Sequence, residues 1–167
     1  NIIMDGPPAM ALGVDPERKG IMSDPPRRPG AEILNWPRLA KLAFFGLVMT
    51  LGTLGMLWHG LQIGSKEHAL TMAFTTFVLF EFFNSFNARA EFGSTFTRKF
   101  FRNRVLWGAL LCVLALQVLV VHWAPAQILF RTTDLSLAEW GLVAAVASSS
   151  LALEELYKLF RRYTRSV

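Results

Sequence analysis

Residues 105–124 read VLWGALLCVLALQVLVVHWA, an apolar run in which Gln117 is the main polar interruption. An α-helix rises about 1.5 Å per residue, so roughly 20 residues cross the ~30 Å hydrocarbon layer of a bilayer. The run is therefore long enough to span a membrane. It predicts a transmembrane helix over 105–124, and the rest of the chain is interpreted around it.

Three more apolar stretches of similar length accompany it, at residues 38–61, 68–88 and 137–160. The chain is 53% hydrophobic and only 17% charged, whereas soluble domains carry about a quarter charged residues. Four buried helices of a soluble protein are the alternative, but the remaining residues cannot supply the polar shell that such a core needs. The sequence predicts an all-α membrane protein, a helical bundle of four full spans plus one partial, broken span.

The basic residues predict which ends of the spans face the cytoplasm. Of the 17 Lys and Arg residues, all but Lys66 and Arg131 lie in three regions: up to Lys41 in the first turn of the first span, between the second and third spans, or from Lys158 near the end of the fourth span onward. Cytoplasmic loops carry the excess of Lys and Arg, so these three regions, the C-terminus included, are expected in the cytoplasm. We divide the chain into a partial span at 1–14, a cytoplasmic loop at 15–37 and a four-helix bundle at 38–167.

The partial span carries a candidate cation site. It reads NIIMDGPPAMALGV, and we expect it to be the second half of a span cut at Asn1. An acid at membrane depth, here Asp5, is a functional hypothesis by default. Pro7 and Pro8 have no amide N–H, so preceding carbonyls lose their helical partners. With Asn1 four residues from Asp5 and on its face, these hard oxygens suit Ca²⁺ or Mn²⁺. The alternative is an interfacial helix end with a solvated Asp5.

Glu81 is a second acid within a span, and two interpretations of it stay open. Asn84 and Ser85 share its helical face, and Thr75 and Thr76 lie within two turns. The group forms either an ion or proton site, or a polar seam that joins neighbouring helices.

Other small or polar residues in the spans have ordinary structural interpretations. Glu154 and Glu155 approach the cytoplasmic end beside Lys158 and are expected at the interface. Small residues in the first full span predict close helix packing: Gly46, Gly52 and Gly55. The histidines near the outer span ends favour no particular site, although a pH or metal role stays open: His59, His68 and His122.

These residues resemble a known family. NIIMDGPPAMALGVDP, followed by IMSDPPRRP, resembles the sixth transmembrane segment and following loop of P-type calcium-transporting ATPases. The similarity is greatest to the secretory-pathway calcium/manganese pumps and their bacterial relatives. MAFTTFVLFEFFNSFN resembles the eighth segment, and TTDLSLAEW resembles the connection into the tenth. The resemblance covers the whole chain, as half of segment six through segment ten.

The resemblance implies a role for each candidate residue. Asn1 and Asp5 match side chains that coordinate the transported ion, and Glu81 matches an acid of a second calcium site. Met4 replaces a coordinating Thr by a thioether, which argues against Glu81 as a ligand and for one ion per cycle. The implied cargo is Ca²⁺, with Mn²⁺ possible, and the membrane is the plasma membrane if the protein is bacterial. The 15–37 loop is expected to contact the phosphorylation domain.

ATP and Mg²⁺ would be used only by the intact protein, because the chain has no Asp-Lys-Thr-Gly phosphorylation motif. Its expected partners are the lipid bilayer and the remaining domains of the same pump, with no nucleic acid. Three alternatives stay open: a P-type pump for Mg²⁺, Na⁺ or H⁺, a stand-alone channel or secondary transporter that uses Asp5 and Glu81, and a non-catalytic membrane scaffold.

Overall fold

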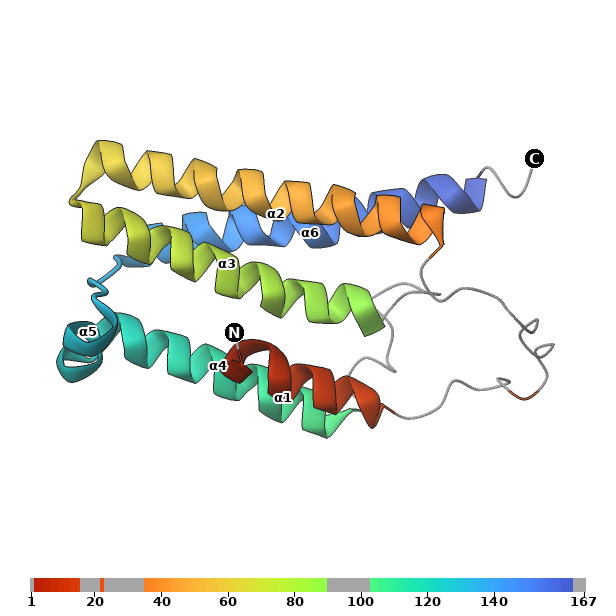
Figure 1. Cartoon of the computed structure of the whole chain (residues 1–167), viewed down its shortest axis with the longest axis horizontal. Coiled ribbons are helices and arrows are strands. Elements are labelled where there is room, and N and C mark those ends of the chain that lie inside the picture. The colour runs from red at the N-terminus through yellow and green to blue at the C-terminus, as the bar shows by residue number, and fades with distance from the viewer. Residues whose placement is uncertain (1, 16–21, 23–34, 90–102, 164–167) are drawn as a thin grey trace.

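A computed structural model describes residues 2–15, 22, 35–89 and 103–163, with side chains for 6–15, 22, 35–89 and 103–159. Asn1, most of the predicted 15–37 loop and residues 164–167 lie outside the described residues. Within the described residues the secondary structure is helical (Figure 1). The helices are α1 (Ile2–Gly13), α2 (Trp36–Ile63), α3 (Lys66–Arg89), α4 (Arg104–His122), α5 (Ala124–Phe130) and α6 (Leu137–Tyr163).

Four of these helices, α2, α3, α4 and α6, are long and apolar enough to cross a membrane. The prediction of an all-α bundle with four full spans is confirmed. One detail differs, because the span expected over 105–124 ends at His122. Trp123 is extended, and Pro125 then starts the short helix α5, which the sequence analysis did not predict. Arg131 adopts a left-handed conformation (φ 54°) and ends α5.

The bundle has two ends that are used as reference points below. The basic end holds the start of α2, the ends of α3 and α6, and the start of α4 (Figure 1, right). The α5 end holds the α2–α3 turn, α5 and the connection into α6 (Figure 1, left). The division into 1–14, 15–37 and 38–167 stays a prediction.

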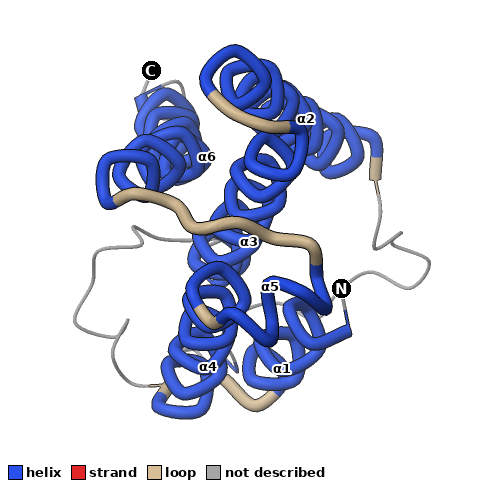
Figure 2. Tube along the Cα trace, turned by 90° about the vertical axis from the view of Figure 1, so that its left-hand side faces the viewer, coloured by secondary structure: helices blue, strands red, loops and turns tan. Residues whose placement is uncertain are grey.

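Helix α3 lies at the centre of the bundle, with α2 and α6 on one side and α1 and α4 on the other (Figure 2). Its residues take part in two apolar clusters. Met72 and Phe80 pack in the cluster shared with α2 and α6. Phe86 packs in the cluster shared with α1 and α4, against Leu106 and Leu110. The central position of α3 explains why it is the most buried of the four candidate spans.

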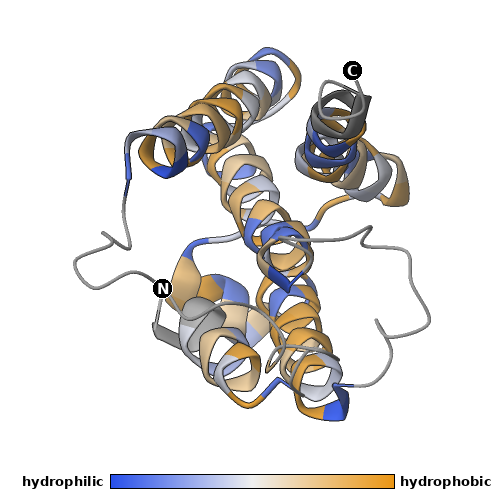
Figure 3. Cartoon of the chain, turned by 90° about the vertical axis from the view of Figure 1, so that its right-hand side faces the viewer, coloured by the Kyte–Doolittle hydropathy of each residue, from blue (hydrophilic) through white to orange (hydrophobic). Residues whose placement is uncertain are grey.

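The outer surface of the bundle is apolar. On α2, leucines and aromatic residues are half to two-thirds exposed: Leu42, Phe44, Leu47, Leu51, Leu54 and Trp58. Figure 3 shows hydrophobic residues along much of the length of the helices, while hydrophilic residues concentrate near helix ends. Such a surface is stable only against another apolar phase, which agrees with a helix that faces lipid.

Glycines bring α2 close to its neighbours at two levels. A Cβ at Gly60 would lie 2.6 Å from the backbone Cα of Ala69 on α3, and one at Gly52 would lie 2.7 Å from the Phe80 ring. The predicted close packing is therefore present at Gly52. At Gly46 and Gly55 a Cβ would meet nothing within 4 Å, so the expectation is wrong for these two within the described chain.

Glu154 on α6 is the most buried acid among the described side chains, with 1% of its surface exposed. Its Oε1 accepts from Lys41 Nζ of α2 at 2.8 Å and lies 3.7 Å from Lys158 Nζ. The ammonium of Lys41 also lies over the ring of Tyr157, 5.5 Å from its centroid. Lys41 compensates the charge of Glu154 and lets the carboxylate pack between α2 and α6, which the sequence did not predict. The interfacial depth expected for Glu154 stays a prediction.

We predict that Gly60→Ala lowers the apparent melting temperature of the purified protein in detergent, whereas Gly55→Ala does not. The new methyl at residue 60 meets backbone that cannot move aside, and overpacking of this kind costs about 1–3 kcal/mol. At residue 55 the methyl meets open space, and Ala is favoured over Gly in a helix by about 1 kcal/mol. Equal melting temperatures for the two variants would contradict the close α2–α3 approach.

We also predict that Lys41→Met lowers the melting temperature more than Lys158→Met does. Loss of Lys41 removes the 2.8 Å partner of a buried carboxylate, and an unsatisfied buried polar group costs about 1–3 kcal/mol. Adding Glu154→Gln to Lys41→Met should recover most of the loss, because the uncompensated charge is gone. If the double variant is no more stable than Lys41→Met, the ion pair is not the cause.

Candidate functional site: the proline-containing helix and its supports

Helix α1 contains both prolines of the predicted cation site and continues through them. Pro7 and Pro8 lie inside the helix that runs from Ile2 to Gly13. In an α-helix each amide bonds the carbonyl four residues earlier, so the carbonyls of Ile3 and Met4 have no helical donor. The interruption is in the hydrogen bonding and not in the path of the chain. Two main-chain oxygens are thereby available beside Asp5.

The backbone of Asp5 belongs to α1, but its side chain is outside the described part, and Asn1 is outside it altogether. Gly6 follows Asp5, and a Cβ placed there would meet nothing within 4 Å. Pro8 and Ala11, in contrast, are buried. The assignment of Asn1 and Asp5 as cation ligands therefore stays a prediction, supported by the local chemistry of α1.

A polar clasp centred on Asp15 holds the C-terminal end of α1. One carboxylate oxygen accepts from Arg89 Nε of α3 at 3.1 Å, and the other accepts from Asn103 Nδ2 at 2.9 Å. The same Asn103 amide donates to the Ala11 carbonyl at 2.8 Å, and its oxygen caps α4 by accepting from Leu106 N. Asp15 thus ties the ends of α1, α3 and α4 together at the basic end.

Glu81 lies half-buried on α3, the helix against which α1 packs. Its backbone carbonyl accepts a hydrogen bond from Ser85 Oγ at 3.0 Å. Asn84 and Ser85, which the sequence places on the same face, are half-buried too. No distance between Glu81 and the side chain of Asp5 follows from these contacts, so Glu81 as a ligand stays a prediction.

The threonines near Glu81 take part in a seam between helices. Thr75 is fully buried, and its hydroxyl oxygen accepts from Gln117 Nε2 of α4 at 2.9 Å. Thr76 is also buried and donates to the Met72 carbonyl of its own helix at 2.7 Å. The Thr75 contact favours the polar-seam interpretation for that residue, whereas the Thr76 bond lies within α3.

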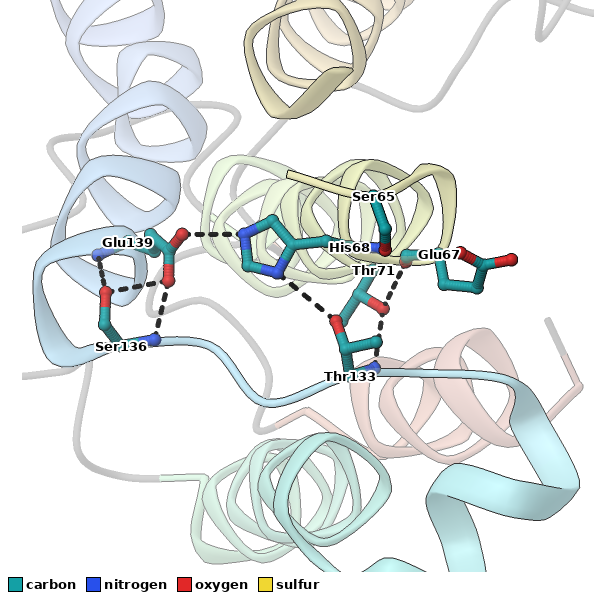
Figure 4. A network of polar contacts seen from close by, with 7 residues as sticks. All are labelled: Ser65, Glu67, His68, Thr71, Thr133, Ser136 and Glu139. Carbon is teal, nitrogen blue, oxygen red and sulfur yellow. Dashed lines mark hydrogen bonds and ion pairs between the residues drawn. The ribbon is translucent and has the colours of Figure 1, made fainter. Parts of the chain in front are cut away.

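A network of polar side chains joins three segments at the α5 end (Figure 4). His68 at the start of α3 contacts Glu139 Oε1 of α6 at 2.7 Å through Nε2 and Thr133 Oγ1 at 3.3 Å through Nδ1. Thr71 Oγ1 accepts from Thr133 N at 3.0 Å. Glu139 also accepts from the Ser136 amide and hydroxyl at 2.7 Å. The connection into α6 is therefore fastened to the start of α3.

None of these groups makes a metal centre among the described side chains, where no three His, Cys, Asp or Glu residues come together to hold an ion. His68 is instead a hydrogen-bonding bridge between α3 and α6. His122 contacts Asp134 and Trp140.

Sequence reasoning missed two functional supports, the Asp15 clasp and the Lys41–Glu154 pair. Their partners are 74, 88 and 113 residues apart in the chain, so no helical spacing signals them. A weak signal existed for Asp15, because it directly follows the apolar segment and carries a charge at a helix end.

Comparison with known proteins agrees with the sequence resemblance. A family model described as "Cation transporting ATPase, C-terminus" matches residues 1–160. A mouse protein named "Calcium-transporting ATPase type 2C member 2" is 38% identical over 98% of this chain. A human "Calcium-transporting ATPase type 2C member 1" is 34% identical over 97% of the chain. The "Calcium-transporting ATPase 1" of Schizosaccharomyces pombe is also 34% identical over 97%.

The chain spans about a fifth of the length of these relatives, since the alignments cover 18% of each. Within that part the similarity extends from the proline-containing helix into α6. The predicted resemblance is confirmed, and this chain belongs to the family of cation transporting ATPase C-terminal regions.

Proposed function

We propose that this chain is the ion-binding membrane portion of an ATP-driven pump that exports Ca²⁺ from the cytoplasm, with Mn²⁺ as a further cargo. The observation that carries the proposal is α1, where two consecutive prolines leave the Ile3 and Met4 carbonyls without helical donors next to Asp5. The names of the relatives, which are calcium-transporting ATPases, support the choice of ion.

The chemistry of α1 matches a hard cation. Carboxylate, amide and main-chain carbonyl oxygens are the ligands that Ca²⁺ takes in proteins, and Mn²⁺ accepts the same set. In this proposal Asn1 and Asp5 bind the ion together with the carbonyls, and Met4 contributes no hard oxygen. Only one ion is then transported per cycle, and Glu81 supports the helix packing without binding the ion.

The Asp15 clasp suggests how movement reaches this site. It joins the end of α1 to α3 and α4, and the predicted cytoplasmic loop follows it directly. If the phosphorylation domain of the intact pump displaces that loop, the movement reaches the C-terminal end of α1 at Asp15. In the proposal, phosphorylation of an aspartate elsewhere in the pump tilts α1 and switches Asn1 and Asp5 between inward and outward access. ATP and Mg²⁺ act on those other domains.

The proposed placement follows from the charge distribution. The basic end faces the cytoplasm with the C-terminus, and the α5 end, with only Lys66 and Arg131, faces the opposite side. In a bacterium the membrane would be the plasma membrane. The proposed partners are the bilayer and the remaining domains of the same pump.

A pump for another cation is the second candidate, and the departure at Met4 favours considering it. A site with few acids places less negative charge around the ion, and ligand charge is one determinant of affinity for Ca²⁺. Mg²⁺, Na⁺ or H⁺ are the alternatives. Membership of the ATPase family argues against the stand-alone channel, the secondary transporter and the scaffold.

We predict that Asp5→Asn in the full-length pump weakens the cation dependence of phosphoenzyme formation by at least about tenfold. A charge-assisted contact contributes about 1.5–3 kcal/mol, and 1.4 kcal/mol is tenfold in affinity. The measurement follows labelled phosphate from ATP in membranes while Ca²⁺, Mn²⁺ and Mg²⁺ are titrated separately. Glu81→Gln should leave the affinity within about twofold and the Hill coefficient near one.

Glu155→Gln is the matched control, since Glu155 pairs with Lys158 at the basic end and away from α1. Unchanged Ca²⁺ and Mn²⁺ dependence in Asp5→Asn would remove Asp5 from the site. A phosphoenzyme that forms without regard to Ca²⁺ or Mn²⁺ in the unaltered pump would favour the second candidate.

A further inference from the structure

His122, at the last residue of α4, links two other segments through its two ring nitrogens. Its Nδ1 lies 2.9 Å from Asp134 Oδ1 in the connection into α6. Its Nε2 lies 3.0 Å from the indole Nε1 of Trp140 in the first turn of α6. The two rings are nearly parallel, 24° apart. One histidine thus fastens the α6 start and its preceding connection to the end of α4.

The chemistry of the partners determines the protonation of the ring. An indole N–H can only donate, and a neutral imidazole has one donor and one acceptor nitrogen. Nε2 must therefore be the acceptor, which leaves the proton on Nδ1, where it is donated to Asp134. Trp140 and Asp134 together select neutral His122 in a single tautomer.

A second proton on His122 is incompatible with this arrangement. It would bind Nε2, and two N–H groups would then face each other across 3.0 Å. The bond to Asp134, in contrast, would become charge-assisted and stronger. Hydrogen bonds from Gln127 and then His122 lower the pKa of Asp134 below its usual value, so this carboxylate is an anion when the ring is protonated.

Among the described charged residues of the surrounding elements, Asp134 is the one that contacts His122 directly. Glu139, the residue before Trp140, is occupied by His68 of α3 at 2.7 Å. Arg131 of the connection is exposed. Helix α5, between α4 and the connection, carries no ionisable side chain. The His122 side chain is 40% exposed at the end of α4.

We propose that His122 is a proton-binding site at the α5 end of the pump, at which one proton breaks the hydrogen bond from Trp140 and weakens the contact between α4 and the start of α6. The site is separate from the cation site of α1 and takes H⁺ as its ligand. Acidification that protonates His122 therefore weakens the α4–α6 contact. Which compartment supplies the proton rests on the topology proposed above.

Tryptophan emission of the full-length pump, titrated from pH 8 to pH 5 without ATP or cation cargo, tests the site. The contribution of Trp140 is the difference between the unaltered protein and Trp140→Phe. We expect that contribution to fall and to shift to the red as one proton binds, because imidazolium quenches indole emission and the freed N–H meets water. Absence of any pH-dependent difference would overturn the proposal.

Two substitutions at His122 imitate the states with and without the hydrogen bond from Trp140. In His122→Gln the amide oxygen can accept from Trp140 and the amide nitrogen can donate to Asp134, without titration. Its Trp140 emission should stay at the pH 8 value throughout. In His122→Lys the side chain only donates, so the emission should show the red shift of the freed indole at every pH, without quenching by imidazolium. A pH transition that persists in both variants would show that another group binds the proton.

Two further variants keep the test decisive if a His122 variant does not fold. Asp134→Asn removes the anion that favours the protonated ring, so the transition should move to lower pH. His68→Gln removes the neighbouring histidine and should leave the transition in place. An unmoved transition in Asp134→Asn, or its loss in His68→Gln, would contradict the assignment to His122.

Sealed vesicles of known orientation show on which side of the membrane the His122 site lies. We expect the emission to respond when pH is lowered on the side opposite the ATP-binding domains, and not when only the ATP side is acidified. A response confined to the ATP side would overturn the outward placement of the α5 end. Because neither cation nor ATP is present, these outcomes are independent of whether Asp5 binds Ca²⁺.

Discussion

Contacts on two opposite sides of α3 hold the bundle together. This helix packs against α2 and α6 on one side and against α1 and α4 on the other. Phe80 and Met72 occupy the first interface and Phe86 the second. In lipid there is little hydrophobic drive for helices to associate, so packing and hydrogen bonds between them carry the stability. α3 supplies both kinds of contact, and α1 packs against α4 and α3 together.

Close approaches and polar pairs occur at successive levels along α3. Gly60 of α2 lies against Ala69 near the α5 end. Gln117 of α4 donates to Thr75 in the middle, and Asn87 donates to the Ser150 carbonyl of α6 toward the basic end at 3.2 Å. The two hydrogen bonds satisfy polar groups between the helices, and the glycine lets their backbones approach closely.

Charge has a different role at each end of the bundle. At the basic end, Asp15 and Glu154 are compensated by Arg89 and Lys41, and these pairs fasten helices to one another. At the α5 end, histidines take the place of Lys and Arg as the partners of acids. A histidine can lose or gain its charge near neutral pH, whereas Arg and Lys cannot. The proton site proposed at His122 belongs to this end.

Properties of single segments of the chain made the membrane spans and the proline-containing helix predictable. Long apolar runs indicate spans because every backbone group in lipid must be satisfied within a helix. Pro7 and Pro8 remove two amide donors wherever the chain is placed, so the two carbonyls without helical donors were visible without a structure. The short helix α5 was not visible, because its seven residues carry no clear period and its end depends on the left-handed Arg131.

The sequence by itself determined the class of the molecule, its four spans, their proposed orientation and the residues offered to a cation, since these follow from composition, length and charge order. Only the tertiary structure decided that Asp15 fastens α1, that Lys41 permits a buried Glu154, and that Trp140 and Asp134 hold His122 in one tautomer. These contacts join residues on different helices, and such proximity arises from packing, which no local pattern in the chain encodes.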